Sequence, residues 1–266
     1  MNLEVIPFGR SDGVRPPLLL IHGAYCGAWV WEEYFIPHLE SLGWHGAALS
    51  LRGHGKSDGY TALDLWGLSD YTDDAELVLD QLGGEAIVIG HSMGGAVAQM
   101  LATRRPLAGM ALMVSVPPTG MAASAHHMWV VHPALTVQLG AVLSWGALGI
   151  DPELMSHGLF SSGTPTAQQS RYLLKFQRES RRAAWEVMLP QQIFRPRKAP
   201  PTLVLGGDAD AFVPESELRA TAEFWDAECH IVPGLPHGMC MDAMWRRAAD
   251  PIATWLEHHT LSLAAE

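Results

Sequence analysis

The stretch EAIVIGHSMGGAVAQM, from Glu85 to Met100, decides the predicted fold of this chain. Its apolar run from Ala86 to Ile89 is rich in β-branched residues and predicts a buried strand. Small and apolar residues from Gly94 to Ala102 predict a helix. Between them stands Gly-His-Ser-Met-Gly, the G-x-S-x-G pattern in which a serine takes a strained strand-to-helix turn. The sequence therefore predicts that Ser92 lies on a sharp turn, where the flanking glycines let strand and helix approach closely.

Length and charge indicate one α/β domain that acts on a small molecule. The chain has 266 residues, which suits a single such domain with an insertion, and its 48% of apolar residues allow a large core. The formal net charge is −11, and no run of Lys or Arg exceeds a pair such as Arg181-Arg182. This balance argues against nucleic acid or an anionic membrane surface as the main partner. We expect a small-molecule substrate, no nucleic acid, no stable membrane association, and a monomer or homodimer.

The cysteines and the first residues indicate a cytoplasmic protein. Cys26, Cys229 and Cys240 lie far apart without a C-x-x-C pair, so neither a disulfide framework nor a structural zinc site is predicted. Residues 1–10 lack a basic start followed by an apolar core, and no stretch approaches eighteen apolar residues. We expect a reducing, cytoplasmic location, no metal and no cofactor.

Strand and helix signals alternate along most of the chain. This rhythm predicts a parallel sheet wrapped by helices, with ligands beyond the carboxyl ends of the strands. The expected strands, besides that before Ser92, cover residues 2–8, 18–22, 47–51, 107–116, 201–206 and 229–232. The expected helices, besides that after Ser92, cover 29–39, 69–82 (with Ser69 as N-cap), 215–225 and 239–258.

The alternation stops over residues 118–197. Apolar residues recur at helical spacing over 128–148 and 167–187, without strand signals. We therefore expect a helical insertion over the sheet, and a core domain made of residues 1–117 and 198–266.

A serine nucleophile needs two further side chains. Its hydroxyl must be activated by a base within hydrogen-bonding reach, and that base must be oriented by a carboxylate. In the chain order nucleophile, acid, histidine, both partners are expected in loops after later strands. Residues 207–214 and 234–238 form such loops, and they supply Asp208, Asp210 and His237.

Five short motifs follow one another in a fixed order along residues 22–242. They are His22-Gly-Ala24 after a strand, Arg52-Gly-His-Gly-Lys-Ser57, Gly90-His-Ser-Met-Gly94, Gly207-Asp-Ala-Asp210 before Val213-Pro214, and His237 before Asp242. In this order and spacing the chain resembles the α/β-hydrolase superfamily, nearest to its carboxylesterase, monoacylglycerol-lipase and lysophospholipase-like branch. The resemblance implies a mostly parallel central sheet flanked by helices, with a helical cap inserted after the sixth strand.

The resemblance also implies roles for particular residues. Ser92 would be the nucleophile, His237 the base and Asp210 the acid, and the backbone N–H groups of Ala24 and Met93 would form the oxyanion hole. Two donors aimed at the oxygen that gains charge stabilise the tetrahedral intermediate, and Met93 N–H also lies at a helix N-terminus. The family spacing favours Asp210 over Asp208, which we expect to tie down its loop through backbone N–H groups.

The cap would roof the active site and shape its pocket. Candidate pocket residues are Tyr25, Met121, Trp129, Trp145 and Phe212. Apolar residues of the cap equally suit the core of its helices. Because a cap that roofs the active site would limit the size of its pocket, the expected substrate is a carboxylic ester of small to medium acyl chain.

Three other activities fit the same sequence. A C–C bond hydrolase or a thioesterase would use the same triad, and a ligand receptor of this fold would keep the triad but turn over slowly. Ser92 excludes the mechanism of relatives that use an aspartate nucleophile.

Overall fold

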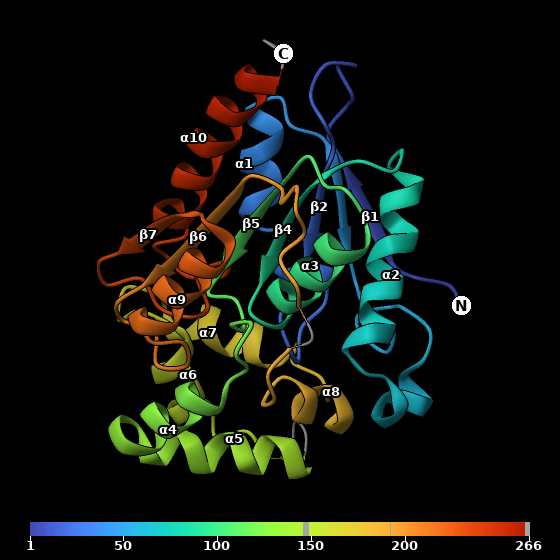
Figure 1. Ribbon diagram of the computed structural model, residues 1–266. Helices are drawn as coiled ribbons and strands as arrows, with labels where there is room; N and C mark the ends of the chain where they lie inside the picture. Colours follow the sequence, from blue (N-terminus) through green and yellow to red (C-terminus); the bar gives the residue numbers. More distant parts are fainter. Residues whose placement is uncertain (146–148, 192, 264–266) are drawn as a thin grey trace.

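A seven-stranded sheet with the strand order β1-β3-β2-β4-β5-β6-β7 forms the centre of the molecule (Figure 1). The computed structural model describes residues 1–145, 149–191 and 193–263. Only β1 pairs antiparallel, and the other neighbours are parallel. The strands are β1 (Val5–Phe8), β2 (Leu18–Ile21), β3 (Gly46–Leu49), β4 (Ile87–His91), β5 (Gly109–Met113), β6 (Thr202–Gly207) and β7 (Glu228–Val232).

The central strands are buried along their whole length. Every residue of β2, β4 and β5 is buried, as expected for parallel strands covered on both faces. This burial explains why their sequences are continuous apolar runs, and it confirms the predicted mostly parallel sheet.

Helices cover both faces of this sheet. Helix α1 packs against α10, α2 packs against α3, and Figure 1 shows the sheet between these two pairs. The flanking elements are η1 (Ala28–Val30), α1 (Phe35–Ser41), η2 (Tyr60–Leu65), α2 (Leu68–Gln81), α3 (Met93–Arg104), α9 (Glu215–Trp225) and α10 (Arg246–Leu263). Among the described residues, no helix is both long enough and apolar enough to cross a bilayer.

In the described part of the chain between β5 and β6, five further helices lie together beyond one end of the sheet (Figure 1). We call residues 118–197 the cap segment. We had expected this segment after a sixth strand. It follows the fifth strand of the chain, because a single antiparallel strand precedes β2. Its helices are α4 (Ala122–Val131), α5 (Pro133–Trp145), α6 (Pro152–Leu159), α7 (Thr166–Leu173) and α8 (Arg181–Glu186).

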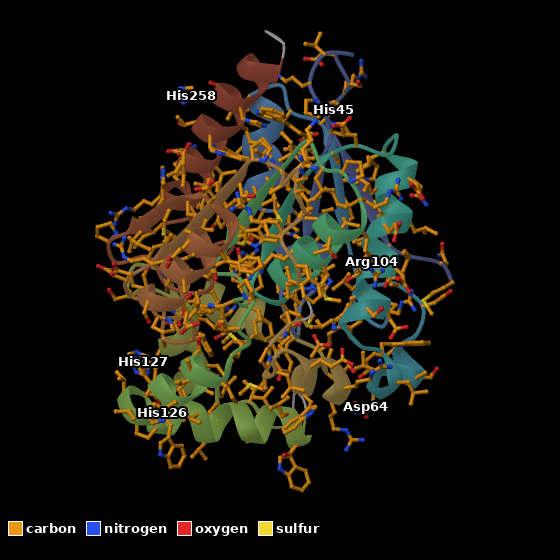
Figure 2. All side chains as sticks on the ribbon, in the orientation of Figure 1. His45, Asp64, Arg104, His126, His127 and His258 are labelled. Carbon is orange, nitrogen blue, oxygen red and sulfur yellow. The ribbon has the colours of Figure 1, made fainter. Side chains whose placement is uncertain are left out.

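Buried and exposed carboxylates join the cap segment to the core. Asp242, which precedes α10, accepts the backbone N–H of Ser161 at 2.7 Å and the hydroxyl of Thr164 at 2.7 Å. At the periphery, Asp64 of η2 pairs with Arg178 and Arg181 at 3.0 and 2.9 Å, and Figure 2 shows Asp64 at the edge of the molecule. The cap segment is therefore attached to the core at separate places.

Several element boundaries differ from the prediction. Helix α2 begins at Leu68, so Ser69 is not its N-cap; Gly67 holds that place, and its N–H is accepted by the Asp70 carboxylate at 2.9 Å. Helix α10 begins at Arg246 and not at 239, because Asp242 fixes a turn by accepting the N–H of Met244. The helix expected over 128–148 is divided between α4 and α5 at Pro133, and residues 146–148 lie outside the described residues.

Candidate active site

Ser92 occupies the turn between β4 and α3. Its backbone has φ 53° and ψ −117°, and a positive φ is uncommon for a residue with a side chain. Close packing around the turn requires glycine, because a Cβ at Gly94 would overlap the carbonyl oxygen of Ile21 and a Cβ at Gly90 that of Gly94. The N–H of Ser92 donates to the carbonyl of Met113 at 2.9 Å. The serine backbone is therefore fixed by β4, α3 and the neighbouring strand β5.

His237 connects Ser92 to Asp210. Its Nε2 lies 3.2 Å from Ser92 Oγ, and its Nδ1 lies 2.7 Å from Asp210 Oδ2. Because a carboxylate only accepts, Nδ1 carries the proton, and the lone pair of Nε2 faces the serine hydroxyl. The other carboxylate oxygen of Asp210 accepts the N–H groups of Phe212 and Val213 at 2.7 and 3.0 Å. The structure thus brings the three predicted side chains into one hydrogen-bonded chain.

Asp208 points to a different partner. Its Oδ1 accepts the backbone N–H of Gly234 at 2.5 Å. Since Gly234 begins the loop that carries His237, Asp208 ties the loop after β6 to the loop after β7. This contact differs from our expectation, in which Asp208 binds N–H groups of its own loop.

The two predicted oxyanion donors lie beside the serine. Met93 is the first residue of α3, so its N–H has no acceptor within the helix and is available at the positive end of the helix dipole. Gly23 packs on the nucleophile so closely that a Cβ there would be 3.1 Å from Ser92 Cβ, which places Ala24 at the same end of the site. Ala24, Met93, Ser92 and His237 all line one cavity.

This cavity has a volume of about 200 Å³ and is walled mostly by apolar side chains. Tyr25, Met121 and Phe212 line it, as predicted from the sequence. The cap segment and the loops contribute further lining side chains that the sequence did not single out as pocket candidates, including Leu139, Leu159, Phe176, Val187 and Met188. These side chains carry no motif, and only their apolar character within the cap segment could have drawn attention to them.

Trp129 and Trp145 do not line the cavity, which corrects our prediction. Their side chains are exposed by 58% and 71%. Met121, the N-cap of α4, and Ala125 and Met128 within it share the face that lines the cavity, at spacings of four and three residues. Trp129 lies at the edge of this face, where its side chain turns to the exterior. Figure 2 shows the labelled His126 and His127 on the outer side of the same helix.

Comparison with known proteins places the chain in a family. A family model described as the alpha/beta hydrolase family matches residues 18–251. The chain belongs to the alpha/beta hydrolase family. The first four curated relatives are matched over only 35% to 42% of their own length.

Three similar proteins illustrate the range of this chain's relatives. A stretch of 107 residues is 36% identical to the AB hydrolase superfamily protein YfhM of Bacillus subtilis (strain 168), and covers 40% of this chain and 36% of that one. A monoacylglycerol lipase of Mycolicibacterium smegmatis is 26% identical over 241 residues, which cover 80% of this chain and 78% of the lipase. A thermophilic esterase from Thermogutta terrifontis has the same fold, with a TM-score of 0.75, 23% identity and coverage of 97% and 94%.

Two buried histidines of this alpha/beta hydrolase stay neutral and support the site. Burial, with nearby His54, lowers the pKa of His22 to about 3, and its Nε2 accepts the N–H of Leu51 at 3.0 Å. Burial, with nearby His237, lowers the pKa of His91 to about 3, and its Nε2–H donates to the carbonyl of His237 at 2.9 Å. Both histidines therefore hold loops of the site by hydrogen bonds and carry no charge at neutral pH.

Proposed function

We propose that this alpha/beta hydrolase cleaves carboxylic esters of small to medium acyl chain through an acyl-enzyme formed on Ser92. The observation that carries the proposal is the hydrogen-bonded chain from Asp210 through His237 to Ser92, which ends at an apolar cavity. A mostly apolar cavity wall beside a polar reacting centre suits a substrate with an apolar acyl group and one ester carbonyl.

In the acylation step, Ser92 Oγ attacks the ester carbonyl while His237 Nε2 takes the hydroxyl proton. The carbonyl oxygen gains the negative charge, and the N–H groups of Ala24 and Met93 stabilise it. The tetrahedral intermediate then expels the alcohol, which receives the proton from His237. Asp210 orients the ring and stabilises the imidazolium, while the N–H groups of Phe212 and Val213 hold its second oxygen.

In the deacylation step, water replaces the alcohol. His237 takes a proton from this water as the oxygen attacks the acyl carbonyl, and the same two N–H groups stabilise the second tetrahedral intermediate. Collapse of the intermediate breaks the bond to Ser92 Oγ, which recovers its proton from His237. The products are a carboxylic acid and the free enzyme.

The cavity volume supports a limited acyl length. A cavity of about 150 Å³ lined by apolar side chains binds benzene, so about 200 Å³ suits an acyl chain of roughly six to eight carbons. The similarity to a monoacylglycerol lipase and to an esterase also favours an ester substrate.

The test combines covalent labelling with turnover. A fluorophosphonate probe should label the wild-type protein and Ser144→Ala, a variant at an exposed serine of α5, and should leave Ser92→Ala unlabelled. A series of 4-nitrophenyl esters from acetate to palmitate should give multiple turnovers with an intermediate optimum. Labelling of Ser92→Ala at equal strength would refute the nucleophile.

The same assays separate the alternatives. A thioesterase would prefer acyl thioesters over the matched oxygen esters, and a C–C bond hydrolase would cleave neither at a useful rate. A receptor would release about one equivalent of 4-nitrophenol and then stall. Sustained ester turnover is the result that the proposed function requires.

A further inference from the structure

A buried carboxylate of the cap segment contacts the oxyanion loop at the wall of the cavity. The side chain of Glu179 is 1% exposed and accepts four hydrogen bonds. Its Oε2 accepts from His54 Nε2 at 3.0 Å and from the N–H of Tyr25 at 3.2 Å. Its Oε1 accepts from the Tyr71 hydroxyl at 2.8 Å and from the N–H of Ser180 at 2.7 Å. A carboxylate has about four acceptor positions, so Glu179 has none left to act as a base or to bind a ligand.

Glu179 and His54 form a buried ion pair. The Nδ1 of His54 lies 3.1 Å from the carbonyl oxygen of Arg52, so both ring nitrogens face acceptors and both carry protons. Burial opposes a charge on this ring, but the Glu179 carboxylate outweighs burial and raises the pKa of His54. Burial likewise opposes the carboxylate, and the pKa of Glu179 is nevertheless held below its usual value by His54 and by the other donors. A buried ion pair is weak evidence for stability. The function of this pair is therefore sought in the residue that it positions.

The residue that it positions follows the oxyanion donor Ala24. Tyr25 has φ 65°, a conformation that a residue with a side chain adopts only when its surroundings hold it. Glu179 holds the N–H of Tyr25, and the N–H of Gln177 donates to the carbonyl of Tyr25 at 3.0 Å. Two residues of the cap segment thus fix the peptide groups on both sides of Tyr25.

The same segment also brackets His54. The side chain of Gln177 accepts the N–H of Gly55 at 2.9 Å and donates to the carbonyl of Gly53 at 2.8 Å. Residues 177–179 therefore bind the oxyanion loop and the His54 loop together, although both loops belong to the core.

We infer that Glu179 is a positioning residue that sets the backbone of Tyr25, so that the oxyanion donor at Ala24 is aligned only while the cap segment is seated on His54. This inference rests on the proposed function, because it concerns the oxyanion hole of that reaction. It predicts that loss of the carboxylate weakens transition-state stabilisation and leaves substrate binding in the apolar cavity largely intact.

The test compares Glu179→Gln with Glu186→Gln. Both replace a cap carboxylate that reaches the core with an amide of similar size, and Glu186 accepts the N–H of Leu68 at 2.7 Å, away from the oxyanion loop. With 4-nitrophenyl butyrate, Glu179→Gln should lower kcat at least about tenfold, since removal of one oxyanion donor costs about 10²- to 10³-fold. It should leave KM within about threefold, and Glu186→Gln should leave both constants within that range.

A second readout separates positioning from a merely structural role. The serine oxygen adds to the carbonyl of a trifluoromethyl ketone, and the adduct is a tetrahedral oxyanion. The affinity of this ketone for Glu179→Gln should therefore fall by the same factor as kcat. Equal kcat values in the two variants, or a ketone affinity that does not follow kcat, would overturn the inference while leaving the proposed function intact. A wild-type protein that neither turns over esters nor is labelled at Ser92 would refute the proposed function, and the inference with it.

If Glu179→Gln yields no folded protein, Tyr71→Phe replaces it in this test. This variant removes one donor to Glu179 and keeps the aromatic ring in the core. We expect its kcat to fall at least about threefold with little change in KM. An unchanged kcat in this variant would overturn the inference.

Discussion

The imidazole of His91 donates its Nε2–H to the backbone carbonyl of His237 across 2.9 Å, so the residue before the proposed nucleophile holds the backbone of the proposed base. The contact itself favours a charged ring, but burial of His91 opposes the charge more strongly. Burial and the neighbouring His237 lower the pKa of His91 from its usual 6.5 to about 3.

The lowered pKa predicts acid-sensitive stability. Between pH 6.5 and pH 3 the unfolded chain binds a proton at His91 that the folded chain does not, so the free energy of unfolding falls as pH falls through this window. His91→Gln keeps an N–H donor but cannot titrate, so its plot of unfolding free energy against pH should be flatter by about 1.4 kcal/mol per pH unit. Urea unfolding measured from pH 7 to pH 4 checks this, with the exposed His127→Gln as control. Parallel plots for wild type and His91→Gln would contradict the assignment.

The two carboxylates after β6 should differ sharply in their effect on rate. Asp210→Asn should lower kcat by about 10⁴-fold, because His237 loses both its orienting partner and the charge that stabilises imidazolium. Asp208→Asn should lower kcat only a few-fold, since it loosens the contact to Gly234 and leaves the Asp210–His237 bond in place. Steady-state kinetics with circular dichroism as a folding control measures both. The reverse order of the two variants would show that the acid has been misassigned.

Acyl-chain preference should depend on Met128 and not on its neighbour Trp129. Met128 lines the cavity, whereas Trp129 is 58% exposed. Met128→Ala enlarges the cavity, so the optimum in a series of 4-nitrophenyl esters should move to longer chains, at a cost of about 2 kcal/mol or more in stability. Trp129→Ala should leave the optimum unchanged. An equal shift in both variants would mean that the cavity does not hold the acyl chain.

Two glycines in helices should respond in opposite ways to alanine. A Cβ at Gly94 would overlap the backbone of β2, whereas a Cβ at Gly140 in α5 meets nothing within 4 Å. Gly140→Ala should raise stability by about 0.5–1 kcal/mol, because alanine loses less backbone entropy in a helix. Gly94→Ala should lose several kcal/mol, as overpacking of a rigid site does. Thermal unfolding of both variants is the measurement, and a stable Gly94→Ala would show that β2 can move away from the serine turn.

The sheet could be predicted because its central strands are continuous apolar runs in the sequence. Leu18–Ile21 and Ile87–Ile89 are apolar throughout, since both faces of these strands are covered. The contact among Ser92, His237 and Asp210 could be predicted because each lies in a short motif after a strand. Helix starts were harder to predict, as the N-cap of α2 shows: Gly67 has no side chain, and Asp70 supplies the contact instead.

The cap segment could be predicted as helical but not in its orientation. Met128 and Trp129 are both large and apolar, and only the packing of α4 on the cavity decides which of them points inward. Glu179 gave no sequence signal at all, because its partners Tyr25, His54 and Tyr71 are 154, 125 and 108 residues away. Contacts at such separations depend on the folded chain and leave no local pattern.

The separation of 145 residues between Ser92 and His237 also has a consequence during biosynthesis. Ribosomes add about 5–20 residues per second, so the serine emerges roughly 7 to 30 seconds before the histidine that would activate it. Strands β2, β4 and β5 can pair in that interval, and the serine turn can form among them. The nascent chain would therefore expose the proposed nucleophile without its base, and the proposed activity would begin only when β7 and the loop after it complete the sheet.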